Sequence, residues 1–98
     1  MGKTCIVTGA NSGIGRSTAV TLAKNDYTVF ATMRSLERGE KLREIARQLS
    51  LKINEVELDV SDTDSVNQGM TEILDQTNEI DVLINNAGIG SNAVIEDV

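Results

Sequence analysis

A glycine-rich segment near the N-terminus carries the clearest chemistry in this sequence. Thr8–Gly15 reads TGANSGIG, follows the apolar run Cys5–Val7 and opens a helical pattern. A glycine-rich turn between a strand and a helix leaves backbone N–H groups unpaired at the positive end of the helix dipole, where phosphate binds without a cationic side chain. Glycine also permits a tight turn, close approach of a pyrophosphate and close helix–strand packing. The segment therefore predicts a phosphate or pyrophosphate site, and a plain tight turn is the alternative.

A second candidate group is Arg34, which lies about 20 residues past the glycines. Dinucleotide folds that prefer NAD place an acidic residue there, which binds the ribose 2′-hydroxyl. The segment Ala31–Ser35 contains no carboxylate. The planar, permanently charged guanidinium of Arg34 suits a 2′-phosphate, and the hydroxyl of Ser12 could add a donor. The pattern favours NADP over NAD. A solvated arginine at a helix start is the alternative for Arg34, and we expect Arg38 to be surface charge.

The elements that must position these groups alternate along the chain. Four short apolar runs predict strands: Thr4–Thr8, Thr28–Met33, Ile53–Leu58 and Ile80–Asn85. Three stretches with helical spacing of apolar residues predict helices: about Gly13 to Lys24, Leu42 to Leu49 and Val66 to Leu74. We expect Ser35 to cap the second helix, and Ser61 with Asp64 to form a capping box for the third.

This order predicts an α/β fold, a Rossmann-type doubly wound parallel sheet with right-handed crossovers and the strand order 3-2-1-4. A crevice then opens at the carboxyl ends of strands one and four, where the glycine turn points. The first two helices cover one face of the sheet and the third covers the other. We expect the chain end to lead into a further helix and strand four to be an open apolar edge, an aggregation hazard. Residues 1–98 would thus be the N-terminal portion of a longer single domain.

Composition narrows the partners. The net charge is −6, with one cysteine, no histidine and no proline among 98 residues. An acidic chain argues against general binding to nucleic acid or to an anionic membrane. A transition-metal site is not expected without histidine, and no apolar run is long enough to span a bilayer. Cys5, inside the first strand, is expected to be a buried hydrophobe. Together these features favour a cytoplasmic protein.

Three motifs stand in register with the predicted strands. Thr8–Gly15 fits TGxxxGIG, Asn85–Gly88 reads NNAG directly after the fourth strand, and Leu58–Val60 places an acidic residue after the third. With these motifs the whole chain resembles the short-chain dehydrogenase/reductase family.

The resemblance implies a role for each matching residue. Contacts to the pyrophosphate and ribose fall to Gly9, Asn11, Ser12, Gly13, Ile14 and Gly15. Asp59 would accept a hydrogen bond from the adenine amino group, and Val60 would pack on the adenine ring. Along the nicotinamide-side ribose lie Asn86, Ala87 and Gly88, while Asn85 ties strands together. The alternatives are a helix-initiating turn at Asp59 and a plain polar turn at Asn85–Asn86.

The family transfers its proton with a Tyr-x-x-x-Lys pair, a Ser and an Asn, all beyond the NNAG strand. Tyr27 is the only tyrosine and has Ala31 four positions later, so no catalytic residue is predicted in this chain. The resemblance implies the cofactor-binding half of an NADP-dependent oxidoreductase that interconverts a carbonyl and an alcohol, a small substrate, and a homo-oligomer formed through helices beyond Val98. A non-catalytic dinucleotide-binding or regulatory module and a partner-binding scaffold are alternatives. A nucleotide-triphosphate enzyme is disfavoured because no lysine follows the glycines.

Overall fold

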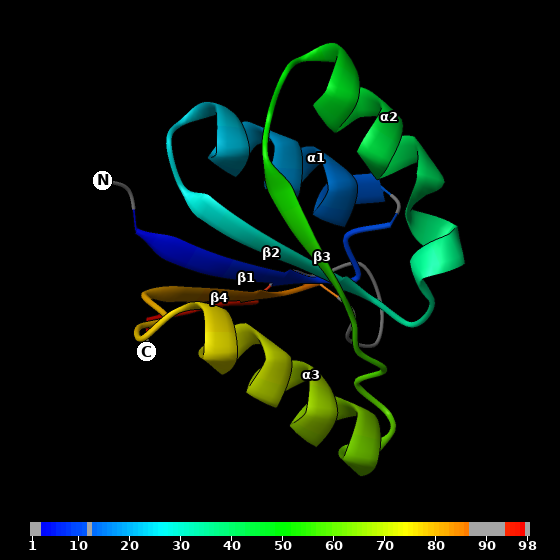
Figure 1. Ribbon diagram of the computed structural model, residues 1–98, viewed down its shortest axis with the longest axis vertical. Coiled ribbons are helices and arrows are strands. Elements are labelled where there is room, and N and C mark those ends of the chain that lie inside the picture. The colour runs from blue at the N-terminus through cyan, green and yellow to red at the C-terminus, as the bar shows by residue number, and fades with distance from the viewer. Residues whose placement is uncertain (1–2, 12, 87–93, 98) are drawn as a thin grey trace.

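Helices and strands alternate through the residues that the structure, a computed structural model, describes: 3–11, 13–86 and the backbone of 94–97 (Figure 1). The strands are β1 (Thr4–Thr8), β2 (Thr28–Met33), β3 (Ile53–Glu57), β4 (Val82–Asn85) and β5 (Val94–Asp97). The helices are α1 (Gly13–Lys24), α2 (Glu40–Gln48) and α3 (Thr63–Gln76), with a 3₁₀ turn, η1, at Leu36–Gly39.

The strands form one sheet in the order β3-β2-β1-β4-β5. β1 lies at its centre, where Cys5 pairs with Val29 of β2 on one side and with Val82 of β4 on the other. The pairings among β1, β2, β3 and β4 are all parallel, so the predicted α/β fold and strand order 3-2-1-4 are confirmed.

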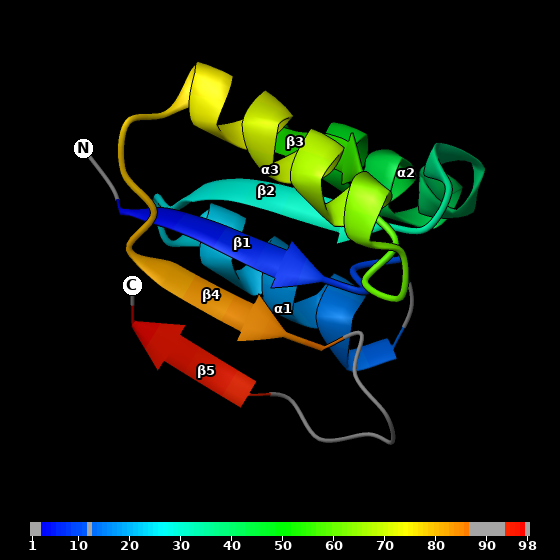
Figure 2. The same cartoon turned by 90° about the horizontal axis from the view of Figure 1, so that it is seen from below.

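The expectation of an open edge at β4 is wrong. β5 runs antiparallel to β4, with Ile84 opposite Ile95, and Figure 2 shows the two strands side by side. Residues Val94–Asp97, which we expected to lead into a further helix, form this strand. The β-branched pair Val94–Ile95 favours that outcome. β5 pairs with backbone groups of β4 that would otherwise lack partners.

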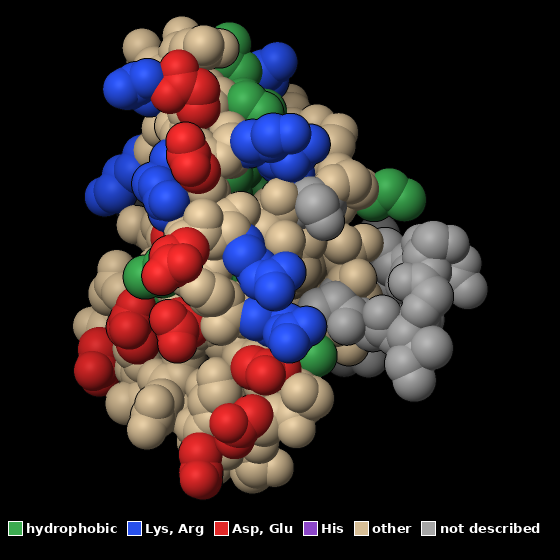
Figure 3. Space-filling view, turned by 90° about the vertical axis from the view of Figure 1, so that its right-hand side faces the viewer, with side chains coloured by type: hydrophobic (Ala, Val, Ile, Leu, Met, Phe, Trp, Pro, Cys, Tyr) green, Lys and Arg blue, Asp and Glu red, His purple; other side chains and the backbone are tan. Residues whose placement is uncertain are grey.

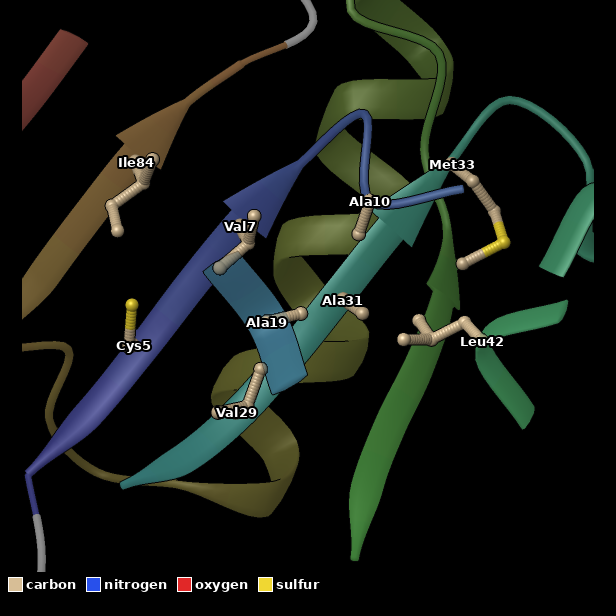
Figure 4. Close-up of a cluster of buried hydrophobic side chains, with 9 residues drawn as sticks. All are labelled: Cys5, Val7, Ala10, Ala19, Val29, Ala31, Met33, Leu42 and Ile84. Carbon is tan, nitrogen blue, oxygen red and sulfur yellow. The ribbon is translucent and has the colours of Figure 1, made fainter. Parts of the chain in front are cut away.

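The sheet separates two apolar cores because side chains of a strand point alternately to opposite faces. On one face Cys5 and Val7 pack with Ala19 of α1 and Leu42 of α2 (Figure 4). On the other face Ile6 and Phe30 pack with Val56 and with Ile73 of α3. Figure 2 shows α3 on the opposite side of the sheet from α1. The predicted distribution of helices over the two faces is therefore confirmed.

Two predicted helix caps differ from those in the structure. Ser35 caps η1, where its Oγ accepts a hydrogen bond from the Glu37 N–H, and α2 starts only after Gly39. The cap of α3 is Asp62, whose carboxylate accepts from the N–H groups of Asp64 and Ser65. The predicted capping box of Ser61 with Asp64 is wrong, because the Ser61 hydroxyl donates to Asp59. A carboxylate at the N-cap also suits the helix dipole.

Within the described ranges, no helix combines the length and apolar character needed to cross a membrane.

Candidate functional site

A pocket of about 260 Å³ lies where β1 to β4 end. Because parallel strands end at the same edge of the sheet, the segments that follow them meet there, as Figure 1 shows. The residues that line the pocket are Gly9, Asn11, Met33, Arg34, Arg38, Leu58, Val60 and Asn86. Its wall therefore combines guanidinium and amide groups with apolar side chains.

The turn between β1 and α1 depends on its glycines. Gly9 and Gly13 have φ of 63° and 56°, in the left-handed region that glycine adopts without strain. Gly15, in the first turn of α1, is buried and has no space for a side chain. A Cβ there would lie against the Gly9 carbonyl oxygen and 2.5 Å from Asn86 Nδ2. The turn is thus close-packed at Gly15.

Hydrogen bonds fix the same turn from outside. The Ala10 N–H donates to the Thr32 carbonyl of β2 at 3.0 Å, and Arg16 Nη1 donates to the Asn11 carbonyl at 3.1 Å. These bonds hold the backbone between β1 and α1 in a defined conformation without using the side chains that line the pocket.

The segment after β4 is tied to β1. Thr8 Oγ1 donates to Asn85 Oδ1 at 2.9 Å, and Asn86 Nδ2 donates to the Gly9 carbonyl at 3.2 Å. The side chain of Asn85 therefore joins β1 to β4, as expected, and Asn86 fixes one wall of the pocket.

Asp59 takes part in a turn between β3 and α3. Its Oδ1 accepts from the Ser61 hydroxyl at 2.7 Å and from the Ser61 N–H at 3.0 Å, while its own N–H donates to Ser65 Oγ at 2.8 Å. The Ser61 hydroxyl, then the Ser61 N–H, and in addition the positive charge of Arg34 hold the pKa of Asp59 below its ordinary value. Asp59 is therefore an anion at neutral pH, within electrostatic reach of Arg34.

A family model described as short chain dehydrogenase matches residues 3–98. The chain belongs to the short-chain dehydrogenase/reductase family. Among its relatives is the 3-oxoacyl-[acyl-carrier-protein] reductase FabG of Thermotoga maritima, which is 37% identical over 94 residues. That match covers 96% of this chain and 38% of the relative.

Solved structures agree. Menthone neomenthol reductase from Mentha piperita superposes with a TM-score of 0.82 at 33% identity, covering 91% of this chain and 32% of the reductase. A variant of actinorhodin polyketide ketoreductase solved with NADPH gives a TM-score of 0.80 at 29% identity, over 89% of this chain and 33% of that one. The chain thus spans about a third of the length of these short-chain dehydrogenase/reductase proteins.

The structure brings part of the predicted set together. The predicted residues that line the pocket are Gly9, Asn11, Arg34, Val60 and Asn86. The predicted residues that do not line it are Gly13, Ile14, Gly15 and Asp59. Gly15 packs against Gly9 and Asn86, whereas Gly13 lines a separate pocket with Arg16 and Ser17. Ser12, Ala87 and Gly88 lie outside the described residues. For Asp59 the hydrogen bonds agree with the turn alternative, but Oδ1 makes both of them, so Oδ2 faces no hydrogen-bond donor among the described residues.

Arg38, which we expected to be surface charge, is exposed, and it also contributes to the pocket wall, a role that we did not predict. Arg38 lines the same pocket as Arg34, because η1 turns the chain after Ser35 and brings the residue four positions after Arg34 back to the end of β2. Figure 3 shows this side of the molecule, with Lys and Arg side chains intermingled with Asp and Glu over its upper and middle parts, and with Asp and Glu at its lower end. The four-residue spacing of the two arginines, just after the strand, is the signal that could have identified Arg38.

Proposed function

We propose that this chain is the cofactor-binding portion of an NADP-dependent oxidoreductase that interconverts a carbonyl and an alcohol by hydride transfer. In this proposal residues 1–98 belong to a longer single domain. The observation that carries the cofactor choice is the pocket wall, where Arg34 and Arg38 stand together and the described lining includes no carboxylate. Two guanidinium groups compensate the negative charge of a 2′-phosphate. A pocket that selects NAD instead places an acidic residue at the ribose 2′-hydroxyl, where a 2′-phosphate would be repelled.

The residues present fit a dinucleotide. The close-packed turn at Gly15 leaves backbone at the N-terminus of α1 for the pyrophosphate. In this proposal Gly9, Asn11, Ser12, Gly13 and Ile14 would contact the pyrophosphate and ribose. Leu58 and Val60 offer apolar surface for an adenine ring, and Val60 is 42% exposed. Asp59 would accept from the adenine amino group, while Asn86, Ala87 and Gly88 would lie along the nicotinamide-side ribose.

The cofactor, when bound, supplies or takes up the hydride, and this chain orients it. We assign no acid or base among these residues. Tyr27 lies immediately before β2, at the opposite end of the sheet from the pocket. The names of the relatives, a 3-oxoacyl reductase and a menthone neomenthol reductase, support a carbonyl or alcohol substrate. The proposal also includes a cytoplasmic location and a homo-oligomer, and cell fractionation and light scattering test these two points.

The test of the cofactor choice is Arg34→Ala in the full-length protein. Loss of a charge-assisted contact should weaken NADP binding by about ten- to a hundredfold and leave NAD binding nearly unchanged. Calorimetric titration with each dinucleotide measures this. Equal losses for both cofactors would contradict the assignment.

A second measurement separates the enzyme from a non-catalytic module. Full-length protein that binds NADPH should oxidise it when a carbonyl substrate is added. Tight NADPH binding without turnover across a panel of ketones and aldehydes would favour a regulatory dinucleotide-binding protein instead.

A further inference from the structure

Arg43 of α2 joins two other elements. Its Nη1 donates to the Leu36 carbonyl of η1 at 3.0 Å and to Glu55 Oε1 of β3 at 2.5 Å. Among the described residues, Arg47, one turn further along the same helix, pairs only with Glu44 of that helix. Arg43 is therefore the α2 arginine that fixes the position of η1 against the sheet.

Both arginines of the pocket lie in or next to η1, the segment that Arg43 holds. Arg34 precedes η1, and Arg38 lies within it. Gly39 closes the segment and is buried, and a Cβ there would lie 2.6 Å from both Met33 Sδ and Glu55 Oε1. The backbone next to Arg38 therefore packs closely against Met33 of β2 and Glu55 of β3. Its position depends on the ion pair between Arg43 and Glu55.

Charge gives the pair a second effect. The Glu55 side chain is only 14% exposed, and its carboxylate lies beside Gly39, next in sequence to Arg38. Glu55 does not line the pocket itself, but a poorly solvated carboxylate beside the residue that follows Arg38 would oppose the binding of an anion by that arginine. Arg43 lies at ion-pair distance and compensates that charge.

We propose that Arg43, through its contacts with the Leu36 carbonyl and Glu55, is a positioning residue that sets the preference for a 2′-phosphate by holding Arg34 and Arg38 at the pocket. This inference rests on the NADP-dependent function proposed above. Arg43 does not line the pocket; it acts through the backbone of η1 and through the charge of Glu55.

The test is Arg43→Gln in the full-length protein, with dissociation constants measured for NADP and NAD. We expect about a three- to tenfold loss for NADP and less than about a twofold change for NAD. The double variant Arg43→Gln with Glu55→Gln should recover part of the NADP affinity, because it removes the uncompensated carboxylate. The matched control is Arg47→Gln, which removes the same charge from the same helix and should change neither constant.

The outcomes separate the two proposals. If wild type prefers NADP and Arg34→Ala loses it selectively, but Arg43→Gln weakens both cofactors alike, then Arg43 is only structural and the inference fails alone. The inference also fails if the double variant recovers nothing, or if Arg47→Gln has the same effect. If wild type binds NAD and NADP equally, the cofactor proposal fails and takes this inference with it.

Discussion

Asn86 Nδ2 donates a hydrogen bond to the carbonyl oxygen of Gly9 across 3.2 Å. The two residues lie 77 positions apart, directly after β4 and β1. The first turn of α1 packs against both partners, since a Cβ on Gly15 would overlap the Gly9 carbonyl and Asn86 Nδ2. Three separate segments therefore define the shape of the proposed pyrophosphate site.

The first prediction concerns this contact. Gly15→Ala should destabilise the fold by about 1–3 kcal/mol, because the added methyl meets backbone that cannot move freely. It should also weaken NAD and NADP binding equally, since the distortion lies at the part of the cofactor that the two share. Thermal unfolding and titration with each cofactor measure these effects.

Gly13→Ala is the matched control for Gly15→Ala. At Gly13 a Cβ meets nothing within 4 Å, and the cost comes only from φ of +56°, roughly 1–2 kcal/mol. The space open at Gly13 means that this glycine is required for its backbone conformation and not for close packing. An unfolding temperature that is unchanged by Gly15→Ala would contradict the close packing described here.

Much of the fold follows from the sequence for identifiable reasons. The strand order follows from alternating apolar runs and helical patterns, because right-handed crossovers leave few arrangements of parallel strands. The bounds of α1 were predicted at Gly13–Lys24 and are those observed, since glycines mark its start. Asn85, with its side-chain bond to Thr8, was also predicted to tie strands together.

What could not be predicted depended on contacts distant in sequence or on competition among similar groups. β5 is four residues long and is defined by its pairing with β4. At α3, Ser61 and Asp62 could each cap the helix, and the bond from Ser61 to Asp59 leaves Asp62 as the cap. Arg38 reaches the pocket only because η1 precedes α2, a turn that the helical pattern did not reveal.

Asp59 gives a prediction about pH. Its pKa is lowered from 3.8 by the two Ser61 hydrogen bonds and by Arg34. A carboxylate whose pKa is lower in the folded state stabilises that state at pH values above its unfolded pKa. This contribution is lost as pH falls through its folded pKa. Asp59→Asn keeps an acceptor for Ser61 but removes the charge. Wild type should therefore exceed the variant in unfolding temperature near pH 7, with the difference shrinking below about pH 4. A difference independent of pH would contradict the prediction.

Cys5 should be unreactive in the folded protein. It is fully buried in β1, and burial raises the pKa of its thiol from 9.0 to about 11. The thiolate is the reactive species, so a disulfide reagent at about pH 8 should label it only through global unfolding. Denatured protein, which contains this single cysteine, serves as the control for complete labelling. Fast labelling under native conditions would contradict the burial of β1.

The same shift in Cys5 predicts a loss of stability in alkali. The unfolded thiol ionises near pH 9.0 and the folded one near 11. As pH rises between these values, ionisation lowers the free energy of the unfolded state only, so the free energy of unfolding falls. The contribution of the buried thiol to the stability of the folded state is fully present below pH 9 and is lost as pH rises toward 11. Cys5→Ala, measured in parallel by urea unfolding, should lack this component of the alkaline decline.

The last prediction compares the buried hydroxyl groups of Thr32 and Thr8. By strand alternation both face the α3 side of the sheet, on neighbouring strands, and they are 0% and 6% exposed. Thr32 Oγ1 has no hydrogen-bond partner among the described residues, whereas Thr8 Oγ1 donates to Asn85. A buried hydroxyl without a partner costs about 1–3 kcal/mol. Thr32→Val keeps the shape and removes that cost, so it should stabilise the protein by about 1–2 kcal/mol.

Thr8→Val makes the same chemical change and should do the opposite. It removes a hydrogen bond that joins β1 to Asn85, worth about 0.5–1.5 kcal/mol. Urea unfolding of the two variants, with equal slopes against denaturant, gives both free energies on one scale. Destabilisation by Thr32→Val would contradict the prediction. It would mean that the Thr32 hydroxyl, like that of Thr8, makes a stabilising hydrogen bond in solution.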